Sequence, residues 1–167
     1  MTSRKITYTP IGTIFSEHTI PAKTPIQPVF ARDCPGRAEI LPEYGEGLRD
    51  LDGFSHIYLI CHFDRVQAVR LTVKPFMQDV ERGLFATRAP CRPNPIGLSV
   101  VRLLKIEGLI LHLADVDILN ETPLLDIKPY TSKFDRLTTS CNGWQDEVNE
   151  ATARIKGRRN YDVRSAK

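Results

Sequence analysis

The sequence predicts a mainly β fold: a small closed or strongly bent antiparallel β-barrel with a C-terminal α-helix and short helical turns. Two observations favour this class. Six or more short segments rich in β-branched and aromatic residues follow one another at close spacing, a pattern typical of β-barrels. No G-x-G-x-x-G follows a strand and opens a helix, and βαβ alternation is missing, so a Rossmann-type nucleotide site is not expected.

The first third of the chain alternates expected strands with irregular segments. Residues 6–15 are β-branched and aromatic, which favours a strand. Residues 19–36 hold four prolines, so we expect a long ordered loop or an extended arm there. A short strand over 37–42 and a brief helical turn over 43–53 follow. The near-continuous apolar run at 54–63 indicates a buried strand.

The middle of the chain continues this pattern. Residues 68–75 alternate apolar and polar side chains, which predicts a half-buried strand. Two apolar segments, 97–108 and 109–119, meet at Gly108 and are typical of a hairpin. Residues 123–130 form another expected strand.

One helix is expected near the C-terminus. Ser140 or Asn142 would cap it, and apolar residues recur at helical spacing in Trp144, Val148, Ala151 and Ile155. We therefore expect a single domain over 1–156 and a basic tail over 157–167. Residues 154–167 carry six Lys or Arg and one Asp, whereas residues 1–153 carry 17 basic and 19 acidic residues. A basic tail is suited to a polyanion such as RNA, although a frayed, solubilising end is the commoner explanation.

The composition and the N-terminal sequence indicate in which compartment we expect the protein. The 167 residues suffice for one domain, no apolar run approaches the ~20 residues of a membrane span, and the N-terminus has no signal-like region. We expect a cytoplasmic protein that does not contact membranes. The four cysteines form no C-x-x-C pair, so free thiols are favoured over a metal site.

The segment at 85–99, "FATRAPCRPNPIGLS", is the strongest functional signal in the chain. Its three prolines preset the backbone around Arg88 and Arg92. A guanidinium on a rigid loop is suited to binding a carboxylate or a phosphate, Asn94 can both donate and accept hydrogen bonds, and Gly97 permits a turn or a close approach. The alternative is a rigid connector whose arginines pair with local acids.

This segment resembles the signature F-A-T-R-x-P-x-R-P-N-P-I-G-x-S of the TsaA/TrmO-like family of tRNA adenosine N6-methyltransferases. "FSHIYLICHF", "DVDILNETPLLDIKPY" at 115–130, "PIGTIFS" near the start and "GW" before the last helix are also similar to family motifs. The resemblance covers residues 10 to about 156.

The resemblance implies a small, dimeric β-barrel that binds S-adenosyl-L-methionine (SAM) without a Rossmann fold. It implies methylation of N6 of the threonylcarbamoyl-modified adenosine beside the tRNA anticodon, and therefore the tRNA anticodon loop as partner. The cofactor-binding positions that it suggests are Pro25, Ile26, Gln27, Asp64, Arg65, Arg88, Leu98, Asn120, Glu121, Thr122 and Pro123. The ring of Phe63 or that of Tyr130 could lie near the sulfonium of SAM.

Two dipeptides depart from the family pattern. Asn120-Glu121 replaces Asp-Gly, and if the family glycine has positive φ, Glu121 is strained there. Asp64-Arg65 replaces the His-Gln of many bacterial members, which changes the groups close to the ligand.

The reaction itself suggests a substrate pocket. The nitrogen of a carbamoyl-adenosine is a weak nucleophile, so a group should accept its proton or bind the carbamoyl. Asp126, Lys128 and Tyr130 share one face of an expected strand, and we expect this face, with Asn94 and Arg92, to line the adenosine pocket. Arg92 would bind the threonine carboxylate and Asp126 would orient Lys128. An ordinary same-face ion pair between Asp126 and Lys128 is an equal alternative.

Two other functions compete with this hypothesis. The chain could be a non-catalytic β-barrel that holds RNA or a nucleotide through Arg88, Arg92 and the tail. It could also be a metal-assisted hydrolase that uses His56, His62 and nearby carboxylates. His56 lies within an apolar run and is more simply a hydrogen-bonded core residue, and Trp144 is most simply part of the core.

Overall fold

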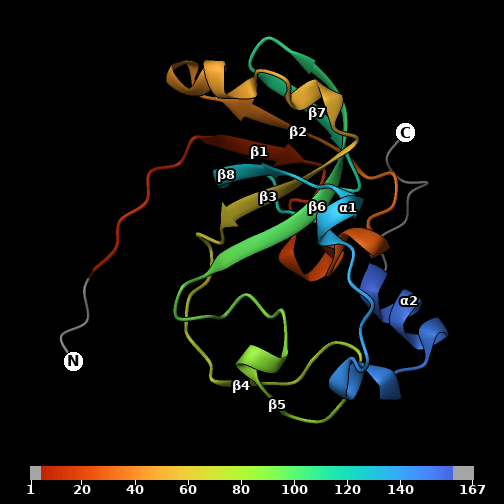
Figure 1. The fold of residues 1–167 in the computed structure, drawn as a ribbon. Helices are drawn as coiled ribbons and strands as arrows, with labels where there is room; N and C mark the ends of the chain where they lie inside the picture. Colours follow the sequence, from red (N-terminus) through yellow and green to blue (C-terminus); the bar gives the residue numbers. More distant parts are fainter. Residues whose placement is uncertain (1–4, 160–167) are drawn as a thin grey trace.

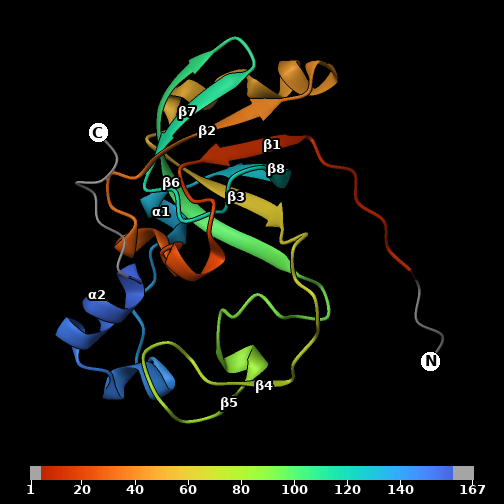
Figure 2. The ribbon, with the colours of Figure 1, turned by 180° about the vertical axis from the view of Figure 1, so that it is seen from behind.

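The computed structural model describes residues 5–159, in which six antiparallel strands close into a barrel. Around the barrel the order is β1, β2, β7, β6, β3, β8, and β8 pairs again with β1 (Figures 1 and 2). The closed mainly β fold that the sequence predicts is confirmed. The strands are β1 (Gly12–Ser16), β2 (Pro35–Ile40), β3 (His56–His62), β6 (Ile96–Glu107), β7 (Ile110–Ala114) and β8 (Thr122–Pro129).

The barrel interior is filled by every second residue of its strands. Because successive side chains point to opposite faces of a strand, the apolar run at 54–63 is only half buried. Its residues alternate between buried and partly exposed along β3, which corrects the expectation of a wholly buried strand. The fully enclosed large side chains include Ile14, Ile57, Leu59, Val101, Leu111, Leu113 and Leu124.

Two expected strands are much shorter than predicted. Of residues 6–15, only the last four lie in β1, which pairs with β2 and β8, and residues 5–10 are exposed. Of residues 68–75, only β4 (Thr72–Val73) is a strand, in a small ribbon with β5 (Arg82–Gly83) outside the barrel. In both cases strand-forming residues lie where no neighbouring strand continues the ladder.

The C-terminal helix also begins later than its apolar spacing predicts. Helix α2 (Glu150–Arg158) starts after Asn149, whose side chain accepts hydrogen bonds from the backbone N–H groups of Ala151 and Thr152. Trp144 lies before it, in a separate 3-10 turn. The short helical elements are α1 (Ser132–Asp135) and the 3-10 turns η1 (Pro21–Lys23), η2 (Pro28–Phe30), η3 (Pro42–Leu48), η4 (Leu51–Gly53), η5 (Leu84–Ala86) and η6 (Gly143–Glu147).

Three long connections leave the barrel at the same end, which we call the loop end. There β1, β3 and β7 finish and β2, β6 and β8 begin. The connections are 17–34, 63–95 and 115–121, and Figure 1 shows the long connection with β4 and β5 beyond this end, beside α2. The antiparallel topology therefore brings segments far apart in sequence to one end of the barrel.

The C-terminal segment holds two of these connections. The carbonyl of Gly157 in α2 accepts the Ile26 N–H at 3.0 Å, and a Cβ at Gly157 would lie 2.5 Å from the ring of Phe30. Trp144 Nε1 donates to the Ala86 carbonyl at 2.8 Å. Helix α2 and η6 thus support the proline-rich arm and the loop that precedes β6.

Helix α2 continues two residues beyond the proposed domain boundary at 156, and residues 160–167 of the basic tail lie outside the described residues. Among the helices of residues 5–159, none has the length and apolar character that a membrane span requires.

Candidate functional site

The loop end collects most of the cofactor positions expected from the sequence. Gln27 lies on the first connection, Arg65 and Arg88 on the second, and Asn120 and Glu121 on the third. Pro25 is buried and Ile26 is held by α2, while Asp64 is exposed at the end of β3. These residues are up to about a hundred positions apart in sequence, so only the barrel topology brings them together.

A direct contact joins the proline-rich arm to the arginine-containing loop. Arg88 Nη1 donates to Gln27 Oε1 at 3.2 Å, across 61 residues of sequence. Both groups are at least partly exposed, so the contact contributes little to stability. The remaining donors of the Arg88 guanidinium can serve an anionic ligand at the loop end.

The third connection ends in a tightly held turn. Asn120 Oδ1 accepts the Ser16 N–H at 3.1 Å, and the Asn120 N–H donates to the His18 carbonyl at 2.8 Å. Arg65 Nη2 donates to the Asn120 carbonyl at 2.7 Å. In the same turn the Thr122 hydroxyl, which is buried, donates to the Leu119 carbonyl. Pro123 follows in β8, opposite Thr13.

Both departures from the family pattern meet at this turn. Glu121 has φ of +63°, which confirms that a side chain stands where the turn favours glycine. Arg65, from the other altered dipeptide, lies 4.0 Å from the Glu121 carboxylate. The two substitutions are therefore in contact, and Arg65 partly offsets the effect of Glu121.

Glycine at position 121 should be better tolerated than alanine. The left-handed backbone costs an L-residue about 1 kcal/mol, whereas the exposed pair with Arg65 contributes less than about 0.5 kcal/mol. The Glu121→Gly variant should therefore be more stable than Glu121→Ala. We expect a difference of about 1 kcal/mol in the free energy of unfolding, as measured by urea titration. An alanine variant as stable as the glycine variant would contradict this account of the turn.

The start of β6 packs tightly against the end of β3. A Cβ at Gly97 would lie 2.4 Å from the Phe63 ring and 2.6 Å from Cys61 Sγ. The Phe63 N–H donates to the Pro95 carbonyl at 2.8 Å. Gly97 is therefore required for close packing, and Phe63 is fixed beside the proline-rich segment that precedes β6.

Arg92 interacts with its own loop. Its Nη1 donates to the carbonyls of Leu84, Thr87 and Ala89 at 3.0–3.4 Å, and its guanidinium lies over the Phe85 ring. The partners are carbonyls, not the local acids that the connector hypothesis assumed. Asn94 is exposed in the same loop. A substrate role for Arg92 and Asn94 stays a prediction.

Asp126 and Lys128, which were expected to line the substrate pocket, lie on the outer face of the barrel. Together with Tyr130 we call them the substrate strip. Ile60 in β3 pairs with Leu98 on one side and with Asp126 on the other, so these three residues form one row. The next row contains Tyr58 and Lys128. Lys128 Nζ lies 2.8 Å from Asp126 Oδ2 with both side chains about half exposed, as in the ion-pair alternative.

Within one chain this strip points away from the loop end. Lys128 lies six residues along β8 from Thr122, a separation of roughly 20 Å at the rise of a strand. Tyr130 lies further along, with its ring 5.6 Å from that of Tyr58. The single chain therefore does not bring Lys128 and Tyr130 to Arg88.

Other side chains differ from their expected roles. His56 is partly exposed, with Nδ1 2.9 Å from the Ser55 hydroxyl, and is not a core residue. His62 lies at the opposite end of β3, so the two histidines cannot share the metal of the hydrolase hypothesis. Trp144 is partly exposed and braces a loop, because it lies before α2 and not on its apolar face.

A carboxylate at the loop end was missed by the sequence reasoning. Asp117 Oδ1 accepts the Ser99 hydroxyl at 2.7 Å, and burial raises the pKa of Asp117 to about 6. The positive charge of Arg88 acts in the opposite direction on this pKa, which indicates that the two side chains belong to the same region. The signal available in sequence was an acidic residue, Asp117, between the apolar residues Val116 and Ile118.

The raised pKa of Asp117 has a consequence for stability. Because the folded state binds this proton more tightly than the unfolded chain, Asp117 should make stability fall as pH rises from about 4 to about 6. Asp117→Asn should remove this contribution and raise the free energy of unfolding by up to about 3 kcal/mol above pH 6. Urea titrations of both proteins between pH 4 and 8 measure it, and a difference that does not change with pH would contradict it.

A separate cavity lies at the opposite end of the barrel. Its volume is about 520 Å³, and its lining includes Ile11, Tyr44 and Leu48, together with Phe54. Asp126 is its one contributor from the expected site. The cavity therefore does not coincide with the group around Arg88, Gln27 and Asn120.

Comparisons with known proteins agree with this description. The sequence profile of the tRNA-methyltransferase O N-terminal domain matches residues 13–136. A probable S-adenosyl-L-methionine-binding protein of Pyrococcus abyssi is 51% identical over 142 residues, which are 85% of this chain and 77% of that protein. A tRNA (adenine(37)-N6)-methyltransferase of Mus musculus is 37% identical over 135 residues, 75% of this chain and 31% of the mouse protein.

A solved structure shares the fold. The crystal structure of TrmO from P. aeruginosa superposes with a TM-score of 0.72 at 36% identity, over 86% of this chain and 63% of that chain. The chain thus spans less than two thirds of this structural neighbour and about a third of the mouse enzyme.

Proposed function

Because the chain belongs to the tRNA-methyltransferase O family, we propose that it is a methyltransferase that uses SAM to methylate N6 of an adenosine in tRNA. The family profile covers most of the described barrel, and the names of several relatives support SAM as the cofactor. We further propose that the substrate is the threonylcarbamoyl-modified adenosine beside the anticodon, reached by contact with the anticodon loop, and that the enzyme acts in the cytoplasm.

The Arg88–Gln27 contact carries the proposal within this structure. It joins the family signature segment to the proline-rich arm at the loop end, where the turn at 120–122 also lies. SAM carries a carboxylate, an ammonium and a sulfonium, so a site for it needs groups of both charges. Arg88 provides the positive charge and Asp117 the negative charge, so the residues of the loop end fit the cofactor.

Each group at the loop end has a distinct proposed task. SAM, when bound, supplies an electrophilic methyl group. Arg88 binds its carboxylate, as a planar guanidinium does best, while Gln27 and the backbone of residues 120–123 hold the remaining polar groups. Asp117, ionised at neutral pH, stabilises the positive charge of the cofactor. Phe63 closes the apolar side next to Gly97.

A homodimer would complete the site. Leu98, an expected cofactor residue, is 59% exposed on the outer face of β6, and Ile96 beside it is 41% exposed. A second copy over this face would bury both residues and could bring the Asp126–Lys128 strip to the partner's loop end. Sedimentation at several protein concentrations tests this, and a monomer throughout would refute it.

Methyl transfer to total tRNA with labelled SAM, followed by nucleoside analysis, tests the activity. We expect label in an N6-methylated threonylcarbamoyl-adenosine, and none when the tRNA comes from cells that lack the threonylcarbamoyl group. SAM binding without any transfer would instead favour a non-catalytic binding protein. Absence of SAM binding by calorimetry at micromolar protein would refute the proposal as a whole.

A further inference from the structure

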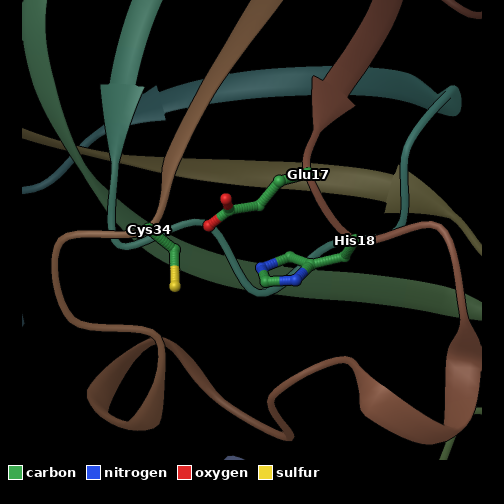
Figure 3. A group of neighbouring side chains, drawn as sticks. All are labelled: Glu17, His18 and Cys34. Atoms are coloured by element: carbon green, nitrogen blue, oxygen red, sulfur yellow. The ribbon is translucent and has the colours of Figure 1, made fainter. Parts of the chain in front are cut away.

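Three side chains able to bind a metal ion meet at the base of the proline-rich arm. Glu17 and His18 follow β1, and Cys34 precedes β2. Their ligand atoms lie within 4.8 Å of one another (Figure 3). His18 and Cys34 are each 3% exposed, and Glu17 is partly buried. The methyl-transfer reaction proposed above uses none of them.

The backbone already holds this group in place. Ser16 and Gly36 are opposite each other in the β1–β2 ladder, so the residues just beyond them are neighbours. The His18 carbonyl accepts the Asn120 N–H, and the Cys34 carbonyl accepts the Val116 N–H at 3.2 Å. The three side chains therefore come from segments with little freedom to separate, as a preorganised ligand site requires.

We propose that Glu17, His18 and Cys34 form a binding site for one divalent zinc ion. A thiolate, an imidazole and a carboxylate are the donors that zinc takes in proteins. One thiolate and one carboxylate balance the charge of the ion, so the occupied site is neutral, which suits a buried position. Ligands of a tetrahedral zinc site lie about 3–4 Å apart, so the side chains need to close by only about 1 Å.

The present contacts are those that the ion would replace. The Cys34 sulfur and the Glu17 carboxylate lie within 4.8 Å of each other, and His18 Nε2 lies 2.8 Å from the Val116 carbonyl. On binding, Cys34 loses its thiol proton to solvent, and the imidazole keeps one proton, on the nitrogen that does not hold the ion. The Val116 carbonyl or a water molecule is available as fourth ligand.

The ion would close the loop that carries the arm. Residues 19–33 lie between the ligands on the two sides, and this loop presents Gln27 to Arg88. A metal bridge across the base of a loop reduces the entropy of its open states. The inferred role is therefore structural, and it departs from the expectation that all four cysteines are simple free thiols.

Titration of the chelator-treated full chain with Zn²⁺ and Co²⁺ tests the proposal. We expect about one ion per chain with a Kd of about 1 µM or tighter, release of about one proton per ion, and a thiolate-to-cobalt absorption band in the near-ultraviolet. Saturating zinc should raise Tm, since the folded state alone holds all three ligands. A protein that takes up neither ion overturns the proposal.

Variants identify the ligands. Cys34→Ser should abolish the cobalt band, and Glu17→Gln and His18→Gln should each weaken zinc binding at least about 10-fold. Cys91→Ser and His112→Gln, which change residues outside the group, should bind zinc like the wild type. An unchanged affinity or cobalt band in Cys34→Ser would refute the site. If Cys34→Ser fails to fold, alkylation of the wild type replaces that variant as the test. Zinc should protect the Cys34 thiol from alkylation, and absence of protection would refute the site.

Discussion

Arg88→Ala should weaken SAM binding by about 10- to 150-fold, the effect of losing a charge-assisted hydrogen bond of about 1.5–3 kcal/mol. The side chain is exposed and donates a hydrogen bond to Gln27 at 3.2 Å. Its removal should therefore leave the free energy of unfolding within about 0.5 kcal/mol of wild type. Calorimetric titration with SAM measures the affinity, and urea unfolding measures the stability.

The matched control removes a positive charge elsewhere. Lys105 pairs with Glu107 at 2.7 Å on the part of β6 remote from the loop end, so Lys105→Ala should bind SAM with wild-type affinity. Equal weakening by both variants would indicate a general electrostatic effect. Wild-type affinity in Arg88→Ala would remove Arg88 from the cofactor site.

Gly97→Ala should destabilise the protein by about 3 kcal/mol. The added Cβ would lie 2.4 Å from the Phe63 ring and 2.6 Å from the fully buried Cys61 sulfur. Neither contact can be relieved without moving a packed side chain, and overpacking of this kind costs about 1–3 kcal/mol or more. Displacement of Phe63 should also weaken SAM binding. Urea unfolding and calorimetric titration measure the two effects.

Gly47→Ala is the matched control, since nothing lies within 4 Å of a Cβ at Gly47 and its φ is not positive. That variant should be as stable as the wild type or slightly more stable, because alanine restricts the unfolded chain. Comparable stability of Gly97→Ala and wild type would mean that Phe63 and Cys61 yield more readily than their packing indicates.

The family signature and the site are related through packing as much as through ligand chemistry. Of the two arginines in residues 85–99, Arg88 remains available at the loop end while Arg92 satisfies three carbonyls of its own loop. Gly97 permits β6 to start against Phe63. Residues 85–99 therefore have two roles. They hold the Arg88 guanidinium outward, and they anchor the loop on the barrel.

The sequence by itself determined the class of fold and the strands with strong patterns. The hairpin at Gly108 forms, although its second strand ends at Ala114 and not at 119, and the strand over 123–130 appears as expected. In both, β-branched residues and a turn glycine act locally. The comparison with the family pattern led us to expect strain at Glu121 if φ is positive there, and its φ is +63°. Local preference was insufficient at 6–15 and 68–75, where strand-forming residues have too few neighbours to pair with.

Only the tertiary structure decided which candidate residues share a site. Closure of the barrel brings Gln27 to Arg88 and Arg65 to Asn120, while the direction of β8 carries Lys128 away from them. It also revealed Asp117 with Ser99, and Glu17 with His18 and Cys34. Contacts between positions this distant depend on strand order and register, which nothing within a few residues of each position encodes.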